Sequence, residues 1–403
     1  DYEVQMADEK FTNMIERDKI APVTRPLCPV HAKLVASCQT CRKRFSLQSD
    51  EDMKRTHAIA EASRPIFEDG KKFIEFDLVP EKGCDPEKIF AQSNFDQVKE
   101  GSYKLLKKLK KTGHLKLFNE NIQEQIDMKF WRKLSAEDWE RWKTSPHFFL
   151  TLGFVENESS LTTPFRQIVD TSRPIRGKFT THSRIFSSPK GCLNDALHVF
   201  LAKSLHELQW ECDASKAYKR IRVSRDSSRY LLAMWFENPE ADDPQILILY
   251  APCFLFGVAQ SAAVLTIFQE RYVAPDCTTE RAKRAVIDGS YADNTCGSGP
   301  DTTTEKKTIE DVAQAFDNNG MVIKTKKGNI SLLPENAADP KLMIDVSFGL
   351  LYDYAHMTMM PSTVLNIHPK RRGASTGPPL TETDIDRKST RLNSSHQIIS
   401  YAV

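Results

Sequence analysis

Apolar residues recur at helical spacing in the first part of the chain, between residues 92 and 145. The residues that carry this pattern are Phe95, Val98, Leu105, Leu106 and Leu109. Gly113 predicts the end of this helix. Ser135, three residues before Asp138, predicts the start of another, because a serine hydroxyl can cap the first turn of a helix. We therefore expect this part of the chain to be helical.

From about residue 148 onward the pattern changes to short runs rich in β-branched and aromatic residues. The runs cover 148–155, 166–169, 205–214, 230–236 and 246–256. Helical runs at 259–272 and 309–316 lie among them without a regular βαβ alternation. This mixture predicts an α+β domain built on an antiparallel sheet.

The segment 208–214 alternates strictly between apolar and polar residues, which predicts a strand with one buried face. Asp213 stands at the end of its polar face, a position that suits a metal-binding carboxylate. A second acid, Asp293, follows 80 residues later in the segment 291–294. Two carboxylates on adjacent strands can share a pair of Mg²⁺ ions. Two distant aspartates alone predict no site, because most surface aspartates are solvated or cap turns.

Composition limits the classes of protein to which the chain can belong. Its 403 residues suggest two or three domains, and 40% hydrophobic with 27% charged residues is typical of a soluble globular protein. The most apolar stretch, 254–268, is too short to span a bilayer. With a net charge of only +2, a polyanionic partner would need a local basic patch, such as the lysines in 104–111. A solvated helix face is the commoner explanation of such a run.

Nine scattered cysteines and the absence of an apolar signal stretch indicate reduced thiols in an intracellular protein that is not secreted. Four residues near the start have the spacing of a possible zinc site: Cys28, His31, Cys38 and Cys41. The gap of six residues between the two pairs is shorter than in most zinc loops, so a loop with free thiols is the alternative. The first residue is not Met, which suggests a piece of a polyprotein.

Seven short motifs stand in an order that resembles the reverse transcriptase of BEL/Pao-type long-terminal-repeat retrotransposons, over about Cys38 to Met360. The motifs are Thr162-Thr-Pro-Phe-Arg-Gln-Ile-Val-Asp-Thr-Ser172, Gly191-Cys-Leu-Asn-Asp195, Asp213-Ala-Ser-Lys-Ala-Tyr218, Phe256-Gly-Val-Ala-Gln-Ser261, Tyr291-Ala-Asp-Asn294, Gly320-Met-Val-Ile-Lys324 with Asn329, and Phe348-Gly-Leu350. Each motif is weak singly, whereas the ordered set is specific.

The resemblance implies an α+β right-hand polymerase fold with fingers and an antiparallel palm sheet. It divides the chain into a polar leader with the Cys/His residues (1–60), a helical connection (61–147), the reverse transcriptase fingers and palm (148–360) and a tail (361–403). Within the tail, residues 386–403 resemble a translated sequencing adapter. They are left out of all reasoning on fold and function.

The resemblance also implies roles for individual residues. Asp213 and Asp293 would bind two Mg²⁺ ions, or Mn²⁺, with the Ala214 carbonyl assisting. Arg166 would hold the incoming triphosphate, because a guanidinium can pair with phosphate oxygens in a bidentate way. Tyr218 would lie under the sugar and exclude a 2′-hydroxyl. Singly, the arginine is as well explained by a surface charge and the tyrosine by a half-buried core aromatic.

Three further residues receive roles in the same way. Gly257 and Ser261 would let the template and the nascent base pair approach the backbone closely, and Lys324 would stand near the pyrophosphate as a proton donor. Singly, the glycine is explained by a turn and the lysine by a solvated side chain.

The sequence departs from the family pattern at several points. Asn294 replaces the second Asp of Y-x-D-D, which should weaken Mg²⁺ binding because an amide carries no charge. Cys192 replaces a serine, and no proline stands beside Ser261. Asp288-Gly289 is a strong local hairpin signal, whereas the family places its turn at Ala292-Asp293. The sequence does not decide between the two turns.

These observations favour an RNA-directed DNA polymerase that extends a primer on an RNA or DNA template with deoxynucleoside triphosphates. Protease, ribonuclease H and integrase segments are not present and would belong to the full polyprotein. The alternative is a relic of a retroelement that binds nucleic acid without polymerising, which Asn294 and Cys192 favour mildly. A zinc-binding module centred on residues 28–41 is a third possibility.

Overall fold

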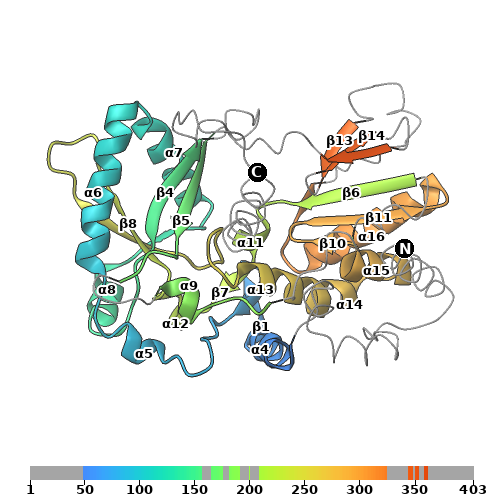
Figure 1. Ribbon diagram of the computed structural model, residues 1–403, viewed down its shortest axis with the longest axis horizontal. Coiled ribbons are helices and arrows are strands. Elements are labelled where there is room, and N and C mark those ends of the chain that lie inside the picture. The colour runs from blue at the N-terminus through green and yellow to red at the C-terminus, as the bar shows by residue number, and fades with distance from the viewer. Residues whose placement is uncertain are drawn as a thin grey trace, which may run out of the picture.

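The structure is a computed structural model that describes residues 49–156, 165–175, 181–190, 199, 208–324, 344–347, 350–353 and 358–361. It is a mixed α/β arrangement of small sheets and helices (Figure 1). One four-stranded sheet lies at one end of the molecule, a helix-rich part lies at the other end, and a three-stranded sheet stands between them.

The four-stranded sheet consists of β6 (Leu208–Ala214), β10 (Ser290–Tyr291), β11 (Asn294–Gly299) and β12 (Ile323–Lys324). Its order is β10-β11-β6-β12, and each neighbouring pair is antiparallel. The antiparallel sheet predicted from the sequence is therefore confirmed.

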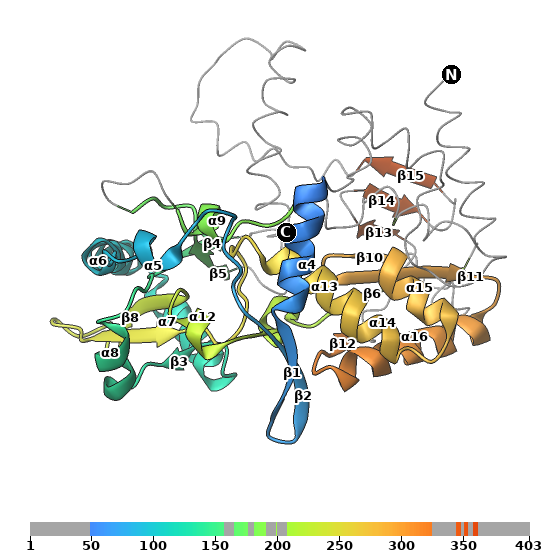
Figure 2. The same cartoon turned by 90° about the horizontal axis from the view of Figure 1, so that it is seen from below.

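Helices from the later part of the chain cover one face of this sheet (Figure 2). They are α13 (Ser261–Phe268), the π-helical turn η1 (Gln269–Val273), α14 (Ala274–Asp276), α15 (Glu280–Asp288) and α16 (Thr302–Asn318). The last of these begins seven residues before the predicted run, because Asp301 caps it by accepting from the Thr304 amide at 2.8 Å. The cap gives the helix a start that the apolar pattern alone did not indicate.

The alternation in β6 corresponds to the two faces of the sheet. Trp210, Cys212 and Ala214 are buried, whereas Glu211 and Asp213 are partly exposed. The indole of Trp210 donates to the buried carboxylate of Glu305 on α16 at 2.6 Å, which satisfies the polar atom of a ring that lies between sheet and helices.

The helix-rich part contains α6 (Phe95–Thr112), α7 (Leu115–Asp127) and α8 (Ala136–Trp142). The first helix ends at Gly113 in a left-handed conformation with φ of 74°, and Ser135 caps α8 by accepting from the Asp138 amide at 3.0 Å. Both helix boundaries predicted from the sequence are confirmed.

Two β elements accompany these helices. A sheet of order β3-β9-β8 is formed by β3 (Arg132–Lys133), β8 (Leu232–Phe236) and β9 (Ile246–Tyr250). An antiparallel ribbon is formed by β4 (Thr151–Glu156) and β5 (Phe165–Asp170). The predicted run 246–256 is longer than β9, because the chain leaves the sheet after Tyr250.

The middle sheet joins segments that are far apart in the sequence. The hairpin of β1 (Ser63–Glu68) and β2 (Lys71–Phe76) projects from the body of the molecule, and β2 pairs in parallel with β7 (Arg222–Val223). Around it lie short helices: α4 (Asp50–Glu61), α5 (Pro86–Ile89), α9 (His182–Ile185), α11 (Ala217–Arg220) and α12 (Arg225–Ser228).

Two segments differ from what the sequence pattern predicted. Residues 61–147 contain β1, β2 and β3 as well as helices, and residues 50–61, for which the sequence predicted no helix, form α4. One buried hydrophobic cluster includes Phe76 of the middle sheet, Trp210 of the four-stranded sheet and Trp235 of the β3-β9-β8 sheet. The N-terminal segment thus shares a core with the rest of the described chain, and the proposed domain boundaries remain a prediction.

A further meander consists of β13 (Ile344–Ser347), β14 (Leu350–Asp353) and β15 (Thr358–Pro361). Phe348 and Gly349 of the last motif lie outside the described residues. Within the part of the chain that the structure describes, none of the helices has the length and apolar character needed to cross a bilayer.

Candidate functional site

Asp213 lies at the centre of the four-stranded sheet, one residue before the end of β6. Its Cα pairs with Asn294 of β11 on one side and with Lys324 of β12 on the other. Residues directly opposite one another in a sheet share a face, with Cβ atoms about 4.5–5.5 Å apart. Three of the residues singled out from the sequence therefore occupy one row across the partly exposed face.

The turn between β10 and β11 brings Asp293 to the same end of β6. The Tyr291–Asn294 pair closes a loop of two residues, Ala292 and Asp293, and the Ala214 amide donates to the Asp293 carbonyl at 2.8 Å. The two aspartates, remote in sequence, thus lie at the same end of the four-stranded sheet, Asp213 in β6 and Asp293 in the turn that leads into the neighbouring β11.

The structure also decides between the two candidate turns. Asp288-Gly289 is the end of helix α15, with Gly289 at φ of −93°, and not a hairpin turn. A Cβ at Gly289 would lie 2.1 Å from the Cys296 carbonyl oxygen, so the glycine is required by the close approach of β11 to the helix end. The real turn contains Ala292 at φ of 53°, a left-handed conformation that costs a non-glycine residue roughly 1 kcal/mol.

Tyr218 lies on α11, five residues after Asp213, and is buried. Its ring meets the ring of Phe256 edge-to-face, with 4.8 Å between the centroids. Phe256 is 37% exposed, which is unusual for a large aromatic residue in a packed turn. The sequence placed Phe256 in a motif but gave it no role. Only the tertiary structure shows that its partly exposed ring lies against the buried ring of Tyr218.

Gly257 makes a close approach to another segment of the protein, whereas the resemblance implied an approach by the template. It has φ of 96°, and a Cβ there would lie 2.3 Å from the Val169 carbonyl oxygen of β5. The Thr171 hydroxyl donates to the Gly257 carbonyl at 2.6 Å. Ser261 is buried, and its hydroxyl donates to the Leu255 carbonyl at 2.8 Å. Gly257 thus holds the turn against the β4–β5 ribbon and Ser261 closes the turn internally, and their contact with a template stays a prediction.

Arg166 lies on β5, the strand that contacts Gly257, and Lys324 lies on β12; for both, only the backbone is described. The candidate zinc residues fall outside the described residues, as does the motif at 191–195. Those residues are Cys28, His31, Cys38 and Cys41.

Lys216 of the third motif and Lys219 just after it contact residues of α7. Lys219 donates to the Gln125 side chain at 2.6 Å and lies 5.4 Å from the centre of the Phe130 ring. Burial lowers the pKa of Lys219 to about 8. Lys216, at φ of 55°, pairs with Glu124 at 3.3 Å. The sequence gave no sign of this link between the helix-rich part and the sheet.

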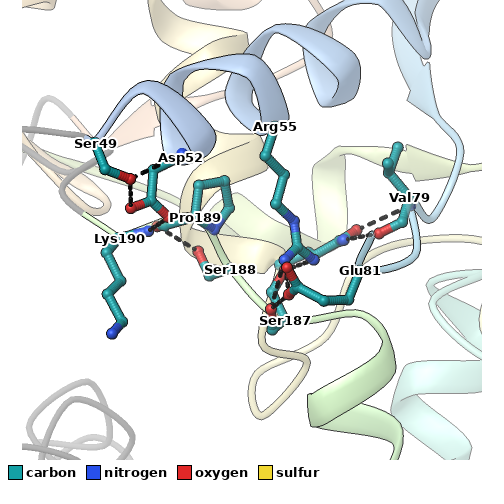
Figure 3. A network of polar contacts seen from close by, with 10 residues as sticks. Ser49, Asp52, Arg55, Val79, Glu81, Ser187, Ser188, Pro189 and Lys190 are labelled. Carbon is teal, nitrogen blue, oxygen red and sulfur yellow. Dashed lines mark hydrogen bonds and ion pairs between the residues drawn. The ribbon is translucent and has the colours of Figure 1, made fainter. Parts of the chain in front are cut away.

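A polar network fixes the chain just before the segment 191–195 (Figure 3). Arg55 of α4 donates to the Ser187 hydroxyl and carbonyl, both at 2.7 Å, and pairs with Glu81. Asp52 of the same helix accepts from the Lys190 amide at 2.9 Å. Helix α4, which the sequence analysis placed in the polar leader, therefore fixes the segment 187–190.

The lysine-rich run lies on the exposed side of α6. Lys104, Lys107, Lys110 and Lys111 are exposed, while Leu106 and Leu109 face the core. The amphipathic pattern explains the helix without any partner, and the exposed lysines leave a basic surface at the end of the molecule opposite the sheet.

The donor set at the sheet edge fits a hard divalent cation. Asp213 and Asp293 offer carboxylates and Asn294 an amide oxygen, and Mg²⁺ usually binds through one or two carboxylates together with substrate phosphates. Among the described residues, no group of three or more His, Cys, Asp or Glu side chains is placed to hold a metal ion. Substrate oxygens would therefore have to complete the coordination.

Comparison with known proteins gives likenesses in structure but none in sequence. No family model matches the chain, and no curated protein matches it in sequence. Among solved structures, a foamy viral protease-reverse transcriptase in complex with RNA/DNA hybrid matches with a TM-score of 0.44 and 11% identity. The match covers 93% of this chain and 41% of that chain, so this chain spans less than half of its length. At this TM-score, neither fold nor function is inferred from the likeness.

Proposed function

We propose that the chain is the fingers and palm of an RNA-directed DNA polymerase from a BEL/Pao-type retrotransposon. One observation carries the proposal: Asn294, Asp213 and Lys324 stand in one row across the sheet, and the Asp293 carbonyl accepts from the Ala214 amide next to that row. Three of the motifs that resemble the family thus meet at the end of β6. The pairing of β6 with β11 and β12 brings together residues that are up to 111 positions apart, and all four of them belong to the motifs that resemble the family.

In this proposal the carboxylates of Asp213 and Asp293 hold two Mg²⁺ ions, with the Ala214 carbonyl assisting. Ions held there would supply Lewis-acid activation of the primer 3′-hydroxyl and charge stabilisation for the leaving pyrophosphate. The chain itself supplies position and charge, which account for most of the catalysis in phosphoryl transfer. Lys324, next to Asp213 across the sheet, donates a proton to the leaving group.

The nucleotide lies between the sheet and the β4–β5 ribbon. Arg166 on β5 binds the triphosphate, and Tyr218 packs under the sugar where a 2′-hydroxyl would collide with the ring. Gly257 lies against the ribbon side, because its carbonyl accepts from Thr171 and its Cα approaches the Val169 carbonyl closely.

Asn294 determines how efficient such an enzyme is. An amide in place of the second carboxylate removes one negative charge from the metal site, so the Mg²⁺ requirement rises, and Mn²⁺ supports activity better. The chain remains a polymerase in this proposal, with an intracellular location and with other Pol segments in its full polyprotein.

Primer extension on an RNA template, with Mg²⁺ or Mn²⁺ and deoxynucleoside triphosphates, tests the proposal. The wild type is expected to extend the primer, Asp213→Ala to abolish extension, and Asn294→Asp to lower the Mg²⁺ concentration needed. If the wild type makes no product while Asn294→Asp does, the second candidate is correct, namely a relic that binds nucleic acid without polymerising. If neither makes product in either metal, the polymerase proposal is wrong.

A further inference from the structure

The turn that carries Asp293 is held by a side chain outside all seven motifs. Gln269 is 2% exposed, and its amide donates to the Ala292 carbonyl at 3.0 Å. Ala292 is the left-handed residue directly before Asp293. The hydrogen bond therefore acts on the one peptide whose conformation sets the direction of the following carboxylate.

Gln269 occupies an unusual place in its helix. It is the first residue of the π-helical turn η1, where the Ala274 amide donates to the Gln269 carbonyl, five residues back. π-Turns inside helices are rare and occur often at functional sites. The carboxy-terminal end of the turn is anchored separately, because Asn319 donates to the Tyr272 carbonyl at 3.1 Å. The irregular turn is thus fixed at both ends by buried side chains.

The hairpin also needs this support for energetic reasons. An alanine at φ of 53° is less stable than in a right-handed conformation by roughly 1 kcal/mol. The hairpin is short, since β10 has only two residues. A hydrogen bond between the Ser290 and Thr295 hydroxyls, at 2.9 Å, is a further side-chain contact across it. A hydrogen bond from a buried amide to the strained peptide opposes relaxation of the turn.

We propose that Gln269 is a positioning residue for the metal site: its amide fixes the Ala292 carbonyl and thereby holds the Asp293 carboxylate at a set distance from Asp213. This inference rests on the proposed function, because it assigns Asp293 to metal binding. Groups that orient metal ligands from outside the coordination sphere typically change metal affinity by about 10–100-fold when they are removed.

The test compares two substitutions that each remove one buried hydrogen-bond donor from neighbouring turns of the same helical segment. Gln269→Met keeps the length of the side chain without its amide. The control is Thr266→Val, because the Thr266 hydroxyl donates only within the helix, to the Ala262 carbonyl at 3.2 Å. We expect Gln269→Met to raise the Mg²⁺ midpoint of primer extension about tenfold, and Thr266→Val to leave it unchanged.

A second readout does not require activity. Hydrogen exchange of the backbone amides of 290–295 should be faster in Gln269→Met than in the wild type and in Thr266→Val. If the wild type does not polymerise, the proposed function fails, but the exchange experiment still decides the inference. Equal exchange in the two variants, or an unchanged Mg²⁺ midpoint in an active Gln269→Met protein, would overturn it.

A third variant separates positioning from a general loss of packing. Glycine adopts left-handed conformations without cost, so Ala292→Gly removes the strain that the hydrogen bond opposes. In that background, the effect of Gln269→Met on the Mg²⁺ midpoint should be smaller than in the wild type. If Gln269→Met does not fold, Gln269→Asn, whose shorter amide cannot span the distance, is expected to show the same shift; an unshifted midpoint there contradicts the proposal.

Discussion

The β1–β2 and β10–β11 hairpins both have turns of two residues, yet the two turns are built in different ways. The β1–β2 turn is Asp69-Gly70, with φ of 50° and 75°, and the β10–β11 turn is Ala292-Asp293, with φ of 53° at its first residue. Asp-Gly is the dipeptide that local preference favours for such turns, and Ala-Asp is not. The first turn forms from its own sequence, whereas the second depends on partners elsewhere in the fold.

The second occurrence of Asp-Gly strengthens this contrast. At 288–289 the same dipeptide ends α15 three residues before the real turn. Its glycine is required by the nearby Cys296 carbonyl and not by a positive φ. The β10–β11 turn keeps an aspartate at its second position against local preference, and the residue before it is strained. Backbone strain of this kind is found preferentially at functional sites. The comparison therefore supports a functional reason for Asp293 that Asp69 does not have.

The largest expected difference between the hairpins is in activity. Asp293→Ala should lower primer extension by about a hundredfold or more, because loss of one metal ligand removes several kcal/mol of charge stabilisation. Asp69→Ala makes the same change in the other turn, where the carboxylate only pairs with Lys129 at 3.2 Å. It should leave the extension rate within about twofold of the wild type, since an exposed ion pair contributes little. Comparable losses in both variants would remove the functional contrast.

The next prediction concerns stability and compares alanine substitutions at a glycine in a strand, Gly297, and at a glycine in a turn, Gly70. A Cβ at Gly297 of β11 would lie 2.4 Å from the Trp210 indole, a rigid neighbour, whereas a Cβ at Gly70 would meet nothing within 4 Å. Gly297→Ala should therefore lower the free energy of unfolding by about 2–3 kcal/mol. Urea denaturation measures this loss, and a value below that of Gly70→Ala would show that the indole can move aside.

Acid sensitivity is expected to arise away from both hairpins. His182 is fully buried between Phe148 and Phe186, and burial lowers its pKa from 6.5 to about 3. Between these values the unfolded chain binds a proton that the folded chain does not. The contribution of His182 to the free energy of unfolding therefore falls as pH decreases from 6.5, by about 1.4 kcal/mol per pH unit at most.

Thermal or urea unfolding of His182→Leu measures this contribution. The variant should lose less stability than the wild type between pH 6.5 and pH 5, and an equal loss would assign the acid sensitivity to other groups.

The smallest effects are opposite in sign at the two turns. Ala292→Gly should stabilise the fold by about 0.5 kcal/mol, as glycine fits a positive φ but also gains freedom in the unfolded chain. Gly70→Ala should destabilise it by about 1 kcal/mol for the converse reason. Equilibrium unfolding of both variants compares them directly; two changes of the same sign would mean that φ does not govern these turns.

Part of the fold could be predicted from the sequence because local rules determine it. The period of apolar residues predicted α6, and two single residues, Gly113 and Ser135, predicted helix boundaries. The alternation in 208–214 predicted a strand with Asp213 on its partly exposed face. Each of these depends on residues within a few positions of one another.

Helix α4, the β2–β7 pairing and the role of Phe256 were not predicted, because they depend on contacts between segments that are distant in sequence, more than 130 positions apart in the first two cases. The sequence by itself therefore determined which elements form and which acids are candidates for chemistry. The tertiary structure alone decided which of two turns closes the hairpin, and that Gln269 and Ala214 hold it. The physical reason is that a turn disfavoured locally can be stable only where hydrogen bonds from distant strands and helices compensate its strain.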